Sequence, residues 1–82
     1  MKKSEREKII AWANDLSDEE LEKKYHDLLY FFVSLGAQID KMYELGYDMS
    51  DISEREEYEK ILSQKCDLLE ELCEKRGIEL WN

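Results

Sequence analysis

Apolar side chains recur at spacings of three and four residues along almost the whole chain, and no proline interrupts them. This spacing places them along one side of an α-helix, which turns once in about 3.6 residues. Only three glycines are present, so few positions favour a break in a helix. The sequence therefore predicts an all-α fold with long helices.

The first two helices are bounded by local signals. A short helix is expected from about Ser4 to Asn14. The segment Ser17–Glu20 has the pattern of a capping box, in which the serine hydroxyl and the glutamate carboxylate each accept a hydrogen bond from a free backbone N–H. The second helix should begin there and run to Leu45, because Gly46 can adopt the left-handed conformation that ends a helix.

The third helix and the chain after it complete the expected fold. Ser53–Glu56 repeats the capping-box pattern, so the third helix is expected to begin at Ser53, after a loop from Gly46, and to run to Arg76. The apolar tail Ile78–Trp81 should then fold back onto the helices. Two long helices joined by a short loop pack antiparallel. The prediction is a small helical bundle: an antiparallel hairpin of two long helices with a short N-terminal helix.

Length and charge restrict the classes of function. The 82 residues predict a single acidic helical domain, residues 1–82, with a net charge of −9. Such a surface repels phosphate groups, so neither direct binding to nucleic acid nor binding to an acidic membrane is expected. The favoured partner is a basic protein surface, such as that of a nucleic-acid-binding enzyme, because complementary charge increases the association rate.

No residue pattern predicts a catalytic, metal or cofactor site. Cys66 and Cys73 lie about 10 Å apart along one helix, too far for a disulfide within it, and two free thiols suit the reducing cytoplasm. The charged start MKKSEREK leads into no long apolar segment, so no signal peptide is expected. His26 is the only histidine and has no second ligand nearby. The expectation is a cytoplasmic protein that is not an enzyme.

The third helix divides into an apolar arc and a charged arc. The apolar arc comprises Tyr58, Ile61, Leu62, Cys66, Leu68, Leu69, Leu72 and Cys73. The charged arc predicts a partner-binding surface, which we call the acidic ridge; it comprises Glu56, Glu59, Asp67, Glu70, Glu71 and Glu74. The alternative interpretation is an ordinary solvated helix face, since charged side chains face water by default.

The second helix has apolar residues on two sides. Beside its main apolar stripe, a second stripe lies about 140° around the helix axis. We call it the outer stripe; it comprises His26, Tyr30, Val33 and Ala37. Uncovered apolar surface of this kind is unusual, so we expect either a homodimer interface along the stripe or packing of the first helix across it.

A short motif in the third helix allows a different interpretation. The segment Ser63-Gln64-Lys65-Cys66-Asp67 resembles the Ser-Gln-Glu-Leu-Asp signature of the small sporulation aspartyl-phosphate phosphatases, which are helical hairpins acting on a response regulator. Ser63, Gln64 and Asp67 match; Lys65 replaces an acidic residue and Cys66 a leucine. The resemblance covers five of the 82 residues and implies that the matching side chains contact a phosphorylated partner.

Three functional hypotheses follow from these patterns. The first is a non-catalytic protein–protein interaction module, a small acidic regulator or inhibitor that docks on a basic partner. In one form it mimics nucleic acid, as phage or mobile-element inhibitors of nucleases of the anti-CRISPR type do; this is an analogy of size and charge. The second is the phosphatase that the motif implies, and the third is a structural homodimeric assembly subunit.

Overall fold

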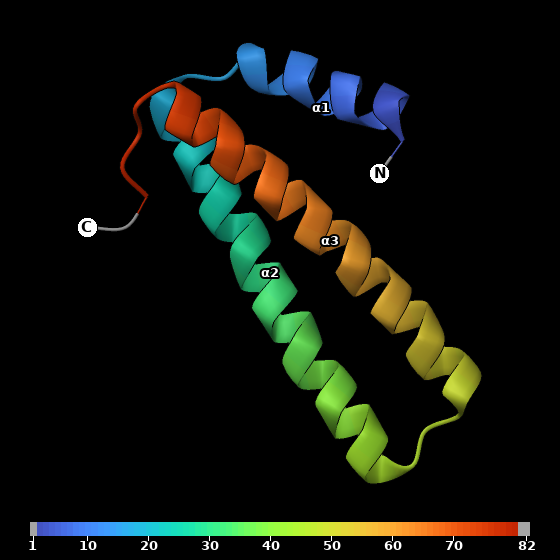
Figure 1. Ribbon diagram of the computed structural model, residues 1–82. Helices are drawn as coiled ribbons and strands as arrows, with labels where there is room; N and C mark the ends of the chain where they lie inside the picture. Colours follow the sequence, from blue (N-terminus) through green and yellow to red (C-terminus); the bar gives the residue numbers. More distant parts are fainter. Residues whose placement is uncertain (1, 81–82) are drawn as a thin grey trace.

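The computed structural model describes residues 2–80, and within this range it contains three helices and no strand: α1 (Lys3–Asn14), α2 (Asp18–Leu45) and α3 (Met49–Lys75). Helices α2 and α3 form an antiparallel hairpin, and α1 lies beside the C-terminal half of α3 (Figure 1). The predicted all-α architecture is confirmed. None of these three helices has an apolar stretch long enough to cross a membrane.

Helix α2 begins at the predicted capping box. The Ser17 hydroxyl accepts a hydrogen bond from the Glu20 backbone N–H at 3.2 Å, and the Glu20 carboxylate accepts one from the Ser17 N–H at 3.1 Å. The hydrogen bond from the Ser17 backbone N–H to the Glu20 carboxylate is the main cause of the lowered pKa of Glu20. Two of the N–H groups that a helix start leaves unpaired are thereby satisfied.

Helices α2 and α3 end in the same way. Gly46 and Gly77 have left-handed φ angles of 74° and 75°. After each glycine the chain turns back, so that the N–H of Tyr47 bonds to the carbonyl of Met42, and the N–H of Ile78 to that of Cys73. This is the Schellman arrangement, which satisfies the last helix carbonyls and needs glycine where φ is positive.

The predicted start of α3 at Ser53 is wrong. The helix begins at Met49, with Asp48 at its N-cap and no side-chain capping bond, so the loop after α2 contains only residues 46–48. The added turn brings Ile52 into the core, where only 1% of its surface is exposed. Burial of a whole isoleucine side chain is worth about 2 kcal/mol and outweighs a capping box worth about 1 kcal/mol.

The core consists of two clusters along the hairpin. The cluster near the C-terminal end of α3 contains Ala13, Leu21, Tyr25, Leu69 and Cys73; the cluster near the loop contains Leu35, Ile39, Met42, Ile52 and Leu62. Ile78 and Leu80 pack against the first cluster, which confirms that the chain after α3 folds back. Trp81 lies outside the described residues.

Two members of the apolar arc predicted for α3 are exposed. Tyr58 and Ile61 keep 54% and 44% of their surface exposed, whereas Leu68 keeps 2%. Helix α1 has 12 residues and is about 18 Å long, so it covers the side of α3 near Leu68 and leaves the half near the loop open. The position of α1 therefore decides which part of the arc enters the core.

Arg76 joins the end of α3 to the turn between α1 and α2. Its guanidinium donates hydrogen bonds of 2.8 Å to the carbonyls of Leu16 and Ala13, and it lies 3.3 Å from the Asp18 carboxylate. The Arg76 side chain is 24% exposed, so these bonds are partly shielded from water. A single cation thus binds the end of α1, the start of α2 and the end of α3 together.

Replacing Arg76 with methionine is expected to lower the free energy of unfolding by about 2 kcal/mol, because two carbonyls lose a charged donor. Urea denaturation followed by circular dichroism measures this change. Lys75→Met is the matched control: its side chain is 70% exposed, and its loss should change the free energy of unfolding by less than about 0.5 kcal/mol. Equal effects of the two substitutions would contradict the assigned role of Arg76.

Candidate interaction surfaces

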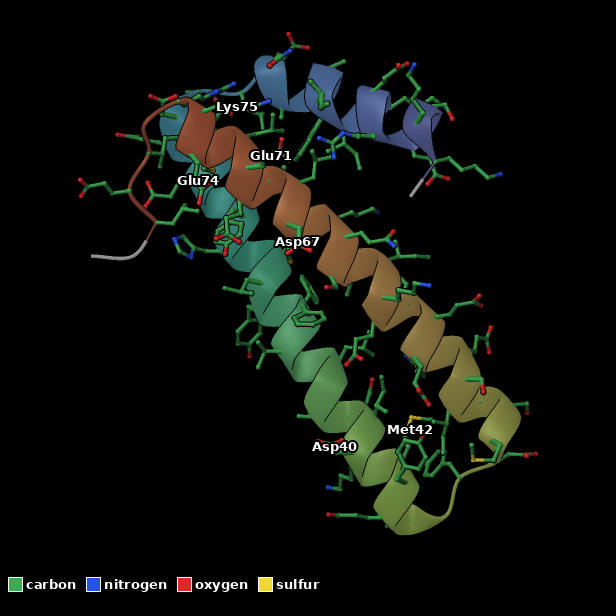
Figure 2. The ribbon with its side chains drawn as sticks, in the orientation of Figure 1. Asp40, Met42, Asp67, Glu71, Glu74 and Lys75 are labelled. Atoms are coloured by element: carbon green, nitrogen blue, oxygen red, sulfur yellow. The ribbon has the colours of Figure 1, made fainter. Side chains whose placement is uncertain are left out.

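The six carboxylates of the acidic ridge differ in exposure. Glu56, Asp67 and Glu74 are exposed, whereas Glu59, Glu70 and Glu71 are half-buried. Figure 2 shows Glu71 on the side of α3 next to α1, and Asp67 and Glu74 on the side away from it. The ridge is therefore one row of residues in sequence but not one uniform surface.

Glu71 is held by an intramolecular network. Its carboxylate lies 3.3 Å from the Arg6 guanidinium on α1 and 3.6 Å from the Lys75 ammonium one turn further along α3. All three side chains are partly exposed, so each pair contributes at most about 1 kcal/mol. Glu71 therefore also helps to attach α1 to α3, and its predicted role in binding a partner stays a prediction.

Glu59 lies in the interface between α2 and α3. A Cβ atom at Gly36 would come within 3.1 Å of a Glu59 carboxylate oxygen, so this side chain occupies the space that the glycine leaves. Gly36 therefore accommodates a half-buried carboxylate from the facing helix. The hairpin thus places Glu59 at the edge of the α2–α3 contact.

Two other ridge carboxylates interact with tyrosines of α2. The Tyr43 hydroxyl donates a hydrogen bond of 2.5 Å to Glu56, and this bond is the main cause of the raised pKa of Tyr43. Burial raises the pKa of Tyr25, and the nearby charge of Glu70 raises it further. Glu56 therefore has a neighbour on α2 while its helix face remains exposed, and Glu70 lies against the edge of the first core cluster.

Most of the negative charge of the chain has no cation beside it. Within residues 2–80, the only carboxylates at ion-pair distance from a basic side chain are Asp18, Glu22 and Glu71, and the partner of Glu22 is His26. Asp67 and Glu74 are exposed and form no ion pair with any residue in that range. These two carboxylates are the ridge members best placed to meet a partner.

The outer stripe of α2 is exposed. Tyr30 and Val33 keep 72% and 62% of their surface exposed, and His26 and Ala37 are exposed as well. Helix α1 packs mainly on α3, so the alternative in which the first helix covers this stripe is wrong. The homodimer alternative stays a prediction.

A cleft between the three helices was not predicted from the sequence. It has a volume of about 400 Å³ and is lined by Ile9 and Trp12 of α1, Leu28 and Phe31 of α2, and Lys65 and Leu69 of α3, with Lys24 and Asp27 at its edge. Phe31 is 63% exposed and Trp12 is 45% exposed. The apolar residues were visible in the sequence, but their convergence depends on the angle at which α1 leaves the hairpin.

The cysteines and the phosphatase-like motif occupy different environments. Cys66 and Cys73 are buried, and burial is the main cause of the raised pKa of both thiols. Asp67 is exposed, but Ser63 and Gln64 are half-buried, and Gln64 lines a hollow beside Glu5 and Lys8 of α1. The three matching side chains of the motif therefore do not share one open surface. In residues 2–80 no histidine, cysteine, aspartate or glutamate cluster could hold a metal ion.

The chain matches no model of a protein family, no curated protein and no solved structure. The exposed surfaces of the three helices are therefore the features from which a function can be inferred.

The two thiols should react slowly in the folded protein. A raised pKa reduces the thiolate fraction, and burial blocks access, so alkylation by iodoacetamide at pH 8 is expected to be at least about tenfold slower than in denaturing urea. Mass spectrometry after timed quenching measures both rates. Fast labelling of either cysteine in the native protein would show that the thiol is accessible and would contradict the core assignment.

Proposed function

We propose that this protein is a non-catalytic protein–protein interaction module that docks its acidic ridge on a basic surface of another protein. The observation that carries the proposal is the uncompensated negative charge. The net charge is −9, and most carboxylates of residues 2–80 have no basic side chain within ion-pair distance. Complementary charge on a partner would relieve this self-repulsion and increase the association rate.

Asp67 and Glu74 are the centre of the proposed contact. Both lie on the side of α3 away from α1, and they are seven residues apart, about 10 Å along the helix axis (Figure 2). Glu70 lies between them in sequence, and Glu56 adds an exposed carboxylate nearer the loop. Because α3 is fixed by its packing on α2, these charges need little ordering on binding, which lowers the entropic cost of association.

One form of the proposal is nucleic-acid mimicry. A row of carboxylates on a rigid helix presents negative charge at regular intervals, as a phosphate backbone does, and so competes for the same basic groove. The partner would then be a nuclease or another nucleic-acid-binding protein, inhibited by occlusion. This form makes a distinct prediction, because nucleic acid and this protein could not occupy the partner at the same time.

The experiment compares two double variants of equal charge change. Proteins captured from a host lysate at low salt are identified, and the dissociation constant of each purified candidate is measured for the wild type and for Asp67→Asn/Glu74→Gln. Loss of two central charges is expected to weaken binding at least about tenfold, since each charged contact contributes about 1 kcal/mol or more. If the protein mimics nucleic acid, duplex DNA added to the complex should compete for the same groove and release the partner from this protein.

Glu54→Gln/Glu57→Gln is the matched control, because both residues are exposed on α3 but lie outside the ridge. This variant should bind within about twofold of the wild type, corresponding to less than about 0.5 kcal/mol. If both double variants bind alike, or if binding does not weaken with added salt, the ridge does not make the contact. Capture of a partner that has no basic surface would also contradict binding through the ridge.

A second candidate function is the aspartyl-phosphate phosphatase implied by the motif at Ser63, Gln64 and Asp67. The observation that favours it is the exposure of Asp67, which could reach a phosphorylated receiver domain. Asp67→Ala should then abolish phosphate release from such a domain while leaving the helical circular dichroism unchanged. Phosphate release at the wild-type rate by Asp67→Ala, or none by the wild type on any receiver domain tested, would exclude this function.

A further inference from the structure

The cleft belongs to a larger apolar face that no segment within residues 2–80 covers. Ile61 lines a hollow with Ile9 and Lys65 next to the cleft, and Tyr58 lies beside Ile61 in the following hollow toward the loop. We call this surface the open face; its members are Ile9, Trp12, Phe31, Tyr58, Ile61 and Lys65. Helix α1 covers the hairpin only beside the C-terminal half of α3, which leaves the rest of the face exposed (Figure 1).

The open face exposes enough apolar surface for a stable interface. Trp12, Phe31, Tyr58 and Ile61 are between 44% and 63% exposed. Three half-exposed aromatic rings and an isoleucine amount to about 350–400 Å² of apolar surface, since one aromatic side chain can bury about 200 Å². A standard interface buries about 800 Å² per partner, of which a little over half, about 450 Å², is apolar. The face therefore supplies most of what one side of such an interface needs.

The charges at the edge of the open face are balanced, unlike those of the chain as a whole. The cleft and the two hollows beside it are lined by four basic residues, Lys8, Lys24, Arg55 and Lys65, and by four acidic residues, Glu5, Asp27, Glu54 and Glu57. On α1, Glu5 and Lys8 are three residues apart, and on α2, Lys24 and Asp27 have the same spacing. A surface with alternating charges can oppose itself across a two-fold axis, because each cation can meet a carboxylate of the other copy.

The acidic ridge and the outer stripe are less suited to a second copy. Two acidic ridges would repel each other, because like charges placed opposite one another are destabilising. The outer stripe has only two large exposed apolar residues, Tyr30 and Val33, on the convex side of a single helix. The concave open face collects side chains from all three helices and so offers better shape complementarity.

We propose that the open face is a two-fold interface between two copies of this chain. In the dimer, Phe31 and Trp12 of each copy are buried against the partner, and the lysines at the edge of the face meet carboxylates of the other copy. Asp67 and Glu74 of the acidic ridge lie on the other side of α3 and stay accessible, so the dimer would present this part of the ridge twice. This inference does not rest on the proposed function, because it concerns a different surface and a different measurement.

Sedimentation velocity at protein concentrations from about 1 to 100 µM tests the proposal. This range covers the dissociation constants expected of an interface of moderate affinity. The wild type should become dimeric within this range. Phe31→Glu and Ile61→Glu should each raise the dimer dissociation constant at least about tenfold, because a carboxylate is placed in an apolar contact on both copies. Both residues are exposed in the single chain, so the helical circular dichroism should be unchanged.

Tyr30→Glu is the matched control, since it makes the same change at the neighbouring, more exposed position on the outer stripe. It should leave the dissociation constant within about twofold of the wild-type value. A wild type that stays monomeric at the highest concentration overturns the proposal, and so does a dimer that Tyr30→Glu breaks and Phe31→Glu does not. Asp67→Asn/Glu74→Gln should still dimerise, which separates this test from the test of the ridge.

Discussion

The packing of α2 against α3 determines the position of every other feature of this protein. Leucines and isoleucines of the two helices form core clusters at both ends of the hairpin, and Tyr25 and Cys73 fill the end next to α1. Because this packing holds both helices along their length, the backbone positions of their outward-facing residues are fixed even where those side chains make no contact. The acidic ridge, the outer stripe and the open face all consist of helix sides that the contact between α2 and α3 does not bury.

Helix α1 adds a small contact with a large effect on the surface. It is too short to be stable alone in water and is attached through Ala13 in the core, the Arg6–Glu71 pair and the hydrogen bonds from Arg76. These attachments direct α1 onto α3 and away from the outer stripe. The cleft exists because α1 contacts one end of the hairpin and does not continue along it.

The distribution of charge gives the two long sides of the hairpin different binding properties. Asp67 and Glu74 lie on the side away from α1 and form no ion pair with any residue from 2 to 80, whereas lysines and carboxylates are mixed around the cleft. A strongly negative side favours a partner of opposite charge, and a balanced apolar side tolerates a copy of itself. A small chain can in this way separate recognition of another protein from self-association.

The sequence alone determined the helical fold, the ends of α2 and the folding back of the tail, because helical periodicity, the Ser17 capping box and the two glycines act over a few residues. It failed at the start of α3, where burial of Ile52 outweighed the local signal at Ser53. It identified the carboxylates of the ridge but not their roles, since the contacts of Glu71 with Arg6 and of Glu59 beside Gly36 join residues far apart in the chain. The cleft could not be found from spacing, because only the tertiary structure sets the angle between α1 and the hairpin.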